Sequence, residues 1–259
     1  TLEAVDAMIA GLEAAGLNIL PVHVRALREP FARDYLQSLM AECPPDIILN
    51  ATAFAASAPG EPRTPSILER ADCPILQTIF ASAEQAAWQD SARGLGPRDL
   101  AMHIALPEVD GRLFTRAVAF KAVARFDQRT ECSIIVPRIL EDRVSFVSQL
   151  TANWAKLRLT PPAERNVALV LANYPNKDGR IGNGVGLDTP ASAAAILNAL
   201  AVEGYDTGSA PTDGAALMLH MTGGITNASP DRPGKVTLSL PAYRDAFATL
   251  PPGAREAIQ

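Results

Sequence analysis

One stretch of the chain, Leu171 to Ser192, constrains the fold more than any other. It reads L-A-N-Y-P-N-K-D-G-R-I-G-N-G-V-G-L-D-T-P-A-S, and a short apolar run, residues 167–171, leads directly into it. An alanine-rich segment with Ile196, Ala199 and Leu200 at helical spacing follows. The order is therefore strand, long Gly/Asn/Asp-rich loop and helix. This order places backbone N–H groups and polar side chains at the carboxyl edge of a sheet, where open α/β folds bind ligands.

Composition limits the classes of protein and partner. The chain has 259 residues, of which 48% are apolar, and a net charge of −5, so one large or two modest domains can form a substantial core. We expect no nucleic-acid partner, because there is no basic excess to neutralise phosphates. We expect no membrane partner, because no apolar run approaches the length of a span. Three cysteines without a C-x-x-C pair exclude a zinc ribbon, and we expect them to be small buried apolar residues of a cytoplasmic protein: Cys43, Cys73 and Cys132.

The first half of the chain alternates between helical and strand patterns. Helices are predicted over an N-terminal stripe that ends at Gly16 and over residues 31–42 and 83–92. Strands are predicted over residues 17–24, 46–52, 73–80 and 100–106. This alternation predicts an α/β unit over residues 1–128 with a parallel, flavodoxin-like or Rossmann-like sheet.

A dense run of charges near residues 125–131 predicts a boundary, with a second α/β unit over residues 129–259. We expect a strand that begins at Cys132 and a long amphipathic helix over residues 139–157, ended by Pro161-Pro162. The strand, loop and helix around residues 167–203 follow, and residues 241–250 form a further helix. Because the chain ends without another strand, we expect this second unit to be incomplete and the sequence to be an interior piece of a longer protein.

Two carboxylates follow the predicted strand at residues 100–106. Glu108 and Asp110 lie in Leu106-Pro107-Glu108-Val109-Asp110-Gly111, and carboxylates two residues apart at a strand edge can share a cation or exchange protons. The same residues would also form an ordinary Asp-Gly turn with a solvated glutamate, and the spacing alone favours that interpretation. His103, in the same predicted strand, is either a metal ligand or a core histidine bonded to a backbone carbonyl, and the second is favoured.

The loop that follows residues 167–171 is open to three interpretations. As a phosphate cradle it fails, because no Gly-Lys-Ser/Thr follows and the glycine spacing is wrong for a dinucleotide fingerprint. A purely structural loop, capped by Asp188 and Thr189, is possible. The third interpretation is a pocket wall for a large polar ligand, which the density of polar side chains favours. The side chains predicted to bind substrate there are Asn173, Tyr174, Asn176, Lys177, Asp178, Arg180 and Asn183.

The string from Leu171 to Ser192 closely resembles the family that joins the large subunit of aerobic cobaltochelatase (CobN) with the H subunit of magnesium chelatase. Further segments agree in the same order: W-Q-D-S-A-R-G-L-G-P-R-D-L at residues 88–100, A-L-P-E-V-D-G at 105–111, P-T-D-G-A-A-L-M at 211–218 and L-S-L-P-A-Y at 238–243. The resemblance covers essentially the whole chain. The first string is highly specific, whereas Pro-Glu-x-Asp-Gly alone is not.

The resemblance implies a function. Members of the family bind a tetrapyrrole, here hydrogenobyrinic acid a,c-diamide, and the divalent metal. They insert Co²⁺ together with two partners, an AAA+ ATPase subunit and its companion subunit, in cobalamin biosynthesis. ATP is hydrolysed on the ATPase, which agrees with the missing phosphate-binding loop in this chain.

Metal insertion removes protons from ring nitrogens and strips water from a hard cation, and carboxylates can do both. Glu108 is therefore the leading catalytic and metal-binding candidate, Asp110 its helper and His103 a weaker metal ligand. We expect the chain by itself to be inactive. Alternatives are magnesium insertion into protoporphyrin IX, a docking scaffold for the ATPase partner, or an enzyme that acts on a sugar or nucleotide.

Overall fold

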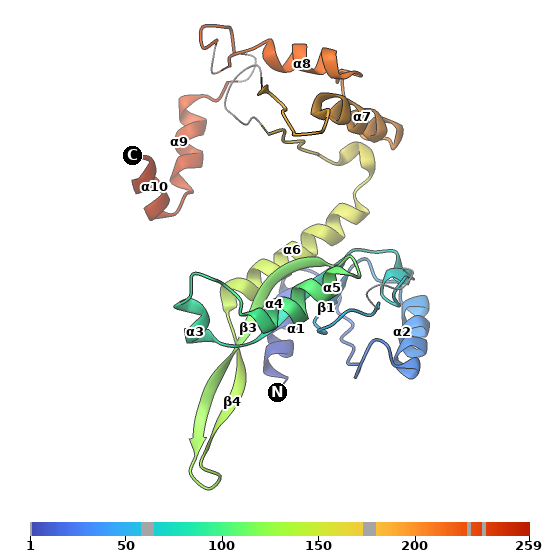
Figure 1. Ribbon diagram of the computed structural model, residues 1–259, viewed down its shortest axis with the longest axis vertical. Coiled ribbons are helices and arrows are strands. Elements are labelled where there is room, and N and C mark those ends of the chain that lie inside the picture. Colours follow the sequence, from blue (N-terminus) through green and yellow to red (C-terminus); the bar gives the residue numbers. More distant parts are fainter. Residues whose placement is uncertain (1, 58–64, 173–179, 227–228, 235–236) are drawn as a thin grey trace. The chain divides into compact units, whose positions relative to one another are not determined.

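The computed structural model describes residues 2–57, 65–172, 180–226, 229–234 and 237–259 (Figure 1). These residues form two compact units, residues 1–160 and 161–259, and each is described by itself. The predicted boundary between residues 128 and 129 differs from this division. It falls in the turn between two strands that pair with each other, β3 (Leu113–Asp127) and β4 (Cys132–Ile139).

The first unit is a mixed α/β structure. Its remaining elements are, in chain order, α1 (Glu3–Ala14), α2 (Pro30–Glu42), β1 (Ile48–Asn50), η1 (Glu69–Ala71), β2 (Ile75–Glu84), α3 (Gln85–Gln89), α4 (Pro97–Leu100), η2 (Ala101–Ala105), α5 (Leu106–Glu108) and α6 (Glu141–Leu159). The predicted helices over residues 31–42 and 139–157 and the strand at residue 132 are confirmed as α2, α6 and β4. The chain cannot extend α6 past Thr160, because Pro161 and Pro162 lack the N–H groups that a further turn needs.

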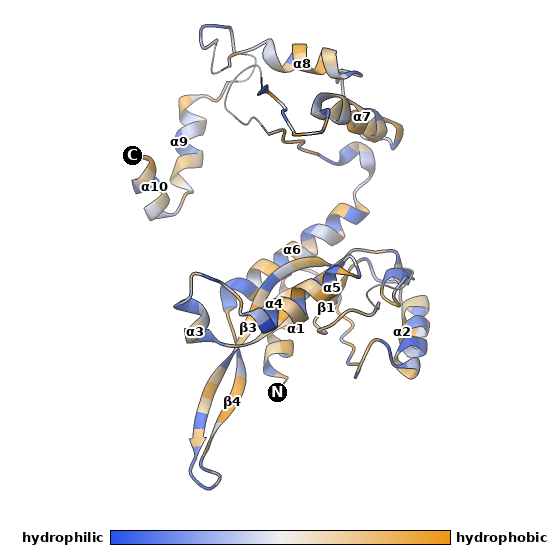
Figure 2. Ribbon diagram, in the orientation of Figure 1, coloured by the Kyte–Doolittle hydropathy of each residue, from blue (hydrophilic) through white to orange (hydrophobic). Residues whose placement is uncertain are grey.

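The four strands form one sheet in the order β1-β2-β3-β4. Strands β1, β2 and β3 are parallel, whereas β4 pairs antiparallel with β3 through a tight turn. The α/β class is therefore confirmed, but the sheet of the described residues is mixed rather than wholly parallel. The β3–β4 hairpin extends beyond the neighbouring helices as a two-stranded arm (Figure 1). In Figure 2 the hydrophobic colours of the sheet continue into this arm, where polar residues interrupt them.

Three apolar clusters hold the first unit together. One joins α1, β3 and α6 through Met8, Leu12, Val118, Val144 and Val147. A second joins α2 to the β1–β2 edge through Leu36, Ile67, Leu68 and Ile75. A third gathers Ile79, Ala81, Ala117 and Phe120 beneath Trp88 and Ile104. Because Phe120 and Val118 are fully buried in β3, the long third strand is the centre of the core.

Two predicted strands are wrong. Residues 17–24 form no strand, and residues 100–106 are helical, from the end of α4 through η2 into α5. The apolar and small residues in this second run are equally compatible with a strand and with a buried helical turn, and the helix start signal Gly96-Pro97 settles the outcome. The buried-cysteine prediction is also wrong, since Cys43 and Cys132 are exposed and Cys73 is only partly buried.

The second unit is mainly helical in its described residues. It contains η3 (Pro162–Glu164), α7 (Thr189–Val202), α8 (Gly214–Thr222), α9 (Leu240–Ala248) and α10 (Pro252–Ile258). The predicted helices after residue 189 and at residues 241–250 are confirmed as α7 and α9. The apolar run 167–171 is not in a strand, so the expected β-element of a second α/β unit is not found in the part that the structure describes. Asp188 rather than Thr189 caps α7, accepting a hydrogen bond from the Ala191 N–H at 3.0 Å.

No helix of the described ranges is both long enough and apolar enough to cross a bilayer.

Candidate functional site

The candidate site is built on a helical segment, residues 97–108, that lies between α3 and the start of β3. The segment changes from an α-turn, α4, to a wider π-turn, η2, and back to α5. Pro107 explains the change: in a regular α-helix its ring would clash with the carbonyl of His103, and it has no N–H to donate. A π-turn loosens the helix at this point, and such turns are frequent at functional sites.

Asp99 fixes the start of this segment to the end of β2. Its side chain is 2% exposed. One carboxylate oxygen accepts the Ser82 N–H at 2.9 Å and the Ser82 hydroxyl at 2.7 Å, and the other accepts the Ala83 N–H at 3.2 Å. Because these bonds satisfy backbone groups at the point where β2 ends, Asp99 positions the helical segment rather than a ligand.

His103 lies at the centre of the π-turn. Its Nε2 is 4.0 Å from an Asp99 oxygen, and its side chain is 13% exposed. Burial lowers the pKa of His103, and the negative charge of Asp99 only partly opposes this shift. The imidazole is therefore neutral near pH 7, the form in which a histidine binds a metal. Its buried Nδ1 has no hydrogen-bond partner among the described residues, so no backbone carbonyl of those residues accepts a bond from this nitrogen. Whether His103 is a metal ligand or a core histidine stays a prediction.

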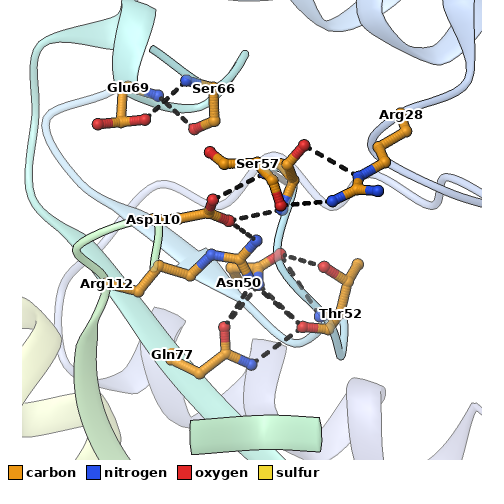
Figure 3. Close-up of polar contacts among 10 residues, drawn as sticks. Arg28, Asn50, Thr52, Ser57, Ser66, Glu69, Gln77, Asp110 and Arg112 are labelled. Atoms are coloured by element: carbon orange, nitrogen blue, oxygen red, sulfur yellow. Dashed lines mark hydrogen bonds and ion pairs between the residues drawn. The ribbon is translucent and has the colours of Figure 1, made fainter. Parts of the chain in front are cut away.

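Asp110 fixes the other end of the segment. It is 2% exposed, and its two oxygens accept the Ala56 N–H at 2.7 Å and the Ser57 N–H at 2.9 Å (Figure 3). The Arg112 guanidinium donates to the same carboxylate at 2.7 Å. Burial opposes ionisation, but these hydrogen bonds and the charge of Arg112 together lower the pKa of Asp110.

The sequence-based role of Asp110 as a helper that shares a cation or exchanges protons is not supported by this geometry. Its carboxylate is buried, ion-paired and occupied by backbone donors from residues 54 and 53 positions away. A carboxylate held in this way stays ionised and tethers two loops. Asp110 therefore connects the turn after α5 to the loop after β1.

Arg112 continues this polar network into the sheet. Its guanidinium donates to the Gln77 side-chain oxygen at 2.9 Å, which also accepts from the Asn50 amide at 2.7 Å. Asn50 and Gln77 both donate to the Thr52 carbonyl oxygen at 3.1 Å. Figure 3 shows these side chains converging between the β1 exit loop and β2. Satisfied buried networks of this kind make a local structure rigid.

Glu108, the leading candidate, is the last residue of α5 and has an exposed side chain. It lies two residues before the tethered Asp110 and five after His103. Glu108 and Asp110 are therefore neighbours in sequence with opposite environments, one in solvent and one in the core. Among the residues that the structure describes, no three His, Cys, Asp or Glu side chains come together as a metal cluster.

The predicted substrate-binding loop is only partly described. Asn173, Tyr174, Asn176, Lys177 and Asp178 lie outside the described residues. Arg180 is exposed and Asn183 is partly buried, and the Asn183 N–H donates to the Arg180 carbonyl at 3.1 Å. Both belong to the second unit, whereas Glu108 and His103 belong to the first. Their roles in holding substrate stay predictions.

The sequence alone assigns no role to Asp99, Arg112, Asn50 or Gln77. Only Asp99 has a local signal, because it follows Gly96-Pro97, which is typical of a helix start, and aspartate is common in a first turn. Each of the other three also contacts a partner 25 to 60 residues away, and no local sequence pattern reveals such a contact.

Known proteins resemble this chain over nearly its whole length. It is 48% identical over 248 residues to an aerobic cobaltochelatase subunit CobN of Sinorhizobium sp and 42% identical over 250 residues to the one of Pseudomonas aeruginosa. Each match covers 95% of this chain and 20% of the relative. Identity to the magnesium-chelatase H protein of Rhodobacter capsulatus is 25%, over 92% of this chain and 21% of that relative.

The fold also resembles a solved structure, the catalytic subunit of cobaltochelatase from Mycobacterium tuberculosis. The TM-score is 0.76 and the identity 31%, over 98% of this chain and 21% of that chain. The chain thus spans about a fifth of the length of these relatives. The CobN/Magnesium Chelatase family matches residues 1–259, and the chain belongs to that family.

Proposed function

We propose that this chain is the tetrapyrrole- and metal-handling portion of an ATP-dependent cobaltochelatase subunit, which inserts Co²⁺ into hydrogenobyrinic acid a,c-diamide in cobalamin biosynthesis. The higher identity to relatives named as cobaltochelatase subunits, 48% and 42%, than to a magnesium-chelatase relative, 25%, supports cobalt as the substrate metal. The observation that carries a role in the chemistry is one solvent-exposed carboxylate, Glu108, on a helical segment tethered at both ends by buried aspartates.

Metal insertion requires a group that accepts protons from the ring nitrogens and replaces water on the incoming ion. Glu108 is suited to both steps, because its carboxylate faces solvent and is not held by an ion pair among the described residues. An exposed, single carboxylate also releases the metal readily, as insertion demands. His103, neutral near pH 7, is the second candidate ligand.

The rigid segment holds the Glu108 side chain in place for the reaction. Asp99 and Asp110 fix the two ends of residues 97–108, so the carboxylate needs little reorganisation when the substrate arrives. Asp110 itself takes no part in proton transfer, since Arg112 and two backbone N–H groups occupy it.

We infer that the remaining parts of the activity lie elsewhere. ATP is hydrolysed by an AAA+ ATPase partner with its companion subunit, and the chain alone is inactive. The reaction class is then a ligase that forms nitrogen–metal bonds, and three free thiols are in keeping with a cytoplasmic location. Polar side chains of the second unit hold the carboxylate and amide groups of the corrinoid by charge-assisted bonds: Asn173, Tyr174, Asn176, Lys177, Asp178, Arg180 and Asn183.

The test is Glu108→Gln in the full-length subunit, assayed with its partners. The amide cannot accept a proton at neutral pH and ligates a hard cation poorly, so we expect the insertion rate to fall about a hundredfold or more while hydrogenobyrinic acid a,c-diamide still binds. Glu131→Gln is the matched control, an exposed glutamate at the tip of the β3–β4 arm. Insertion at the wild-type rate by Glu108→Gln would remove Glu108 from the reaction. Faster insertion of Mg²⁺ into protoporphyrin IX than of Co²⁺ into the corrinoid would favour the magnesium alternative.

A further inference from the structure

Phe54, in the loop after β1, has a backbone conformation that its side chain disfavours. Its φ is +67°, in the left-handed region, and its side chain is 56% exposed. A left-handed backbone conformation is strained for a bulky residue. A phenylalanine ring in water also lacks the favourable free energy that burial of its apolar surface would give. Both properties are unfavourable in the free protein, so other interactions must hold the loop in this shape.

Those interactions surround Phe54 on both sides. Before it, Asn50 and Gln77 each donate to the Thr52 carbonyl at 3.1 Å. After it, Asp110 accepts the N–H groups of Ala56 and Ser57 at 2.7 and 2.9 Å.

Three further hydrogen bonds hold the loop around Phe54. The Arg28 guanidinium donates to the Ala56 carbonyl at 3.0 Å and to the Ser57 carbonyl (Figure 3). The Phe54 N–H itself donates to the Met102 carbonyl at 3.0 Å. The backbone of Phe54 therefore rests against the π-turn that carries His103.

Phe54 differs from the other non-glycine residues of the described chain with positive φ, Asp72 and Glu131. Asp72 follows the short helix η1, and Glu131 lies in the tight turn of the β3–β4 hairpin, where such values are ordinary. No tight turn or helix end requires the conformation of Phe54, whose side chain is exposed and whose backbone is hydrogen-bonded to Met102 in the helical segment of the candidate site. Residues that neighbouring contacts hold in a strained conformation are concentrated at ligand-binding positions.

We infer that Phe54 is a substrate-contacting residue whose ring packs against the tetrapyrrole macrocycle. This inference rests on the proposed function. A macrocycle offers a broad apolar surface, and an aromatic ring on a loop whose backbone is already fixed covers such a surface without ordering the loop further. Binding then buries the ring that the free protein leaves in water, while Glu108 and His103 act on the metal.

The experiment compares the affinity of the full-length subunit for hydrogenobyrinic acid a,c-diamide, from the quench of protein fluorescence, in three variants. Phe54→Gly removes the ring and relieves the strain, so we expect affinity to fall about tenfold while the melting temperature changes by no more than about 2 °C. Phe54→Tyr keeps the ring and should bind within about twofold of wild type. Glu131→Gly relaxes the same backbone conformation far from the loop and should leave affinity unchanged.

Each other outcome counts against the inference. Full affinity in Phe54→Gly overturns it, and so does an equal loss in Phe54→Gly and Phe54→Tyr, because the ring would then not be the contact. If Phe54→Gly binds normally while Glu108→Gln still abolishes insertion, only this inference fails. If the wild-type subunit binds no corrinoid, the proposed function fails with it.

Discussion

Two aspartates in different regions of the first unit bind backbone N–H groups, but they differ in how much of the structure they hold together. Asp110 and Asp127 each accept hydrogen bonds from two backbone N–H groups. Asp110 is buried beside Arg112 at 2.7 Å and joins loops more than fifty residues apart. Asp127 is partly exposed, lies 3.9 Å from Arg125 and fastens only its own turn at the tip of the β3–β4 arm. Burial and sequence separation, rather than the number of bonds, make a carboxylate a structural tether.

The largest expected difference between the two is in stability. Asp110→Ala leaves the buried Arg112 unpaired and two backbone N–H groups unsatisfied, so we expect the free energy of unfolding to fall by about 3–5 kcal/mol. Asp127→Ala removes an exposed turn contact and should change the free energy of unfolding by about 1 kcal/mol or less. Denaturant unfolding of both variants, followed by circular dichroism, gives the comparison. Equal losses would contradict the distinction between tether and turn.

The pH dependence of stability sharpens the same comparison for Asp110. Its native pKa is lowered, so it contributes stability that is fully present above the unfolded value of about 3.9 and is lost as pH falls through the native pKa. We expect the difference in unfolding free energy between wild type and Asp110→Asn to be constant near neutral pH and to shrink in acid. Unfolding curves from about pH 7 down to about pH 2.5 measure it. A difference that grows in acid would contradict the assigned direction.

The smallest expected effect concerns the other tether, Asp99. Its negative charge partly opposes the burial that lowers the pKa of His103. Asp99→Asn keeps the shape of the side chain and removes that charge, so the pKa of His103 should fall further. A titration of the His103 ring protons by nuclear magnetic resonance detects the shift. An unchanged or raised pKa would mean that the two side chains do not interact as described.

The parts of the fold that can be predicted from the sequence have strong local signals. Helices α2, α6 and α7 have apolar spacing and clear ends, such as Pro161-Pro162 after α6. The run from Leu100 to Leu106 shows neither the 3.6-residue spacing of a helix nor the strict alternation of a strand. It is a short apolar run that ends at Pro107, and such a run is typical of a buried strand, whereas the chain forms a π-turn there. The first residues of strand β3 carry no clear strand signal, and the charges near residue 125 resemble a domain boundary rather than a hairpin arm.

Sequence alone can suggest a single exposed residue of the candidate site, but not the residues whose roles depend on distant partners. The proposed insertion chemistry needs an accessible carboxylate, and the sequence predicts Glu108 for this role. The Glu108 side chain is exposed, and its role in insertion stays a prediction. The sequence suggests Asp110 as its helper, yet the Asp-Gly pattern cannot reveal that Ala56, Ser57 and Arg112 hold its side chain. The strain at Phe54 has no sequence signal, since it arises from contacts on both sides of the loop.

The most direct test of the central claim, that the buried tether acts through Glu108, is a double-mutant cycle on the rate of Co²⁺ insertion by the full-length subunit with its partners. Single variants Glu108→Gln and Asp110→Asn are compared with the double variant at a temperature where all are folded. If Asp110 only positions Glu108, Asp110→Asn slows insertion in the wild-type background and has no further effect once Glu108 is replaced. If the two losses multiply, Asp110 contributes independently of Glu108 and the claim is contradicted.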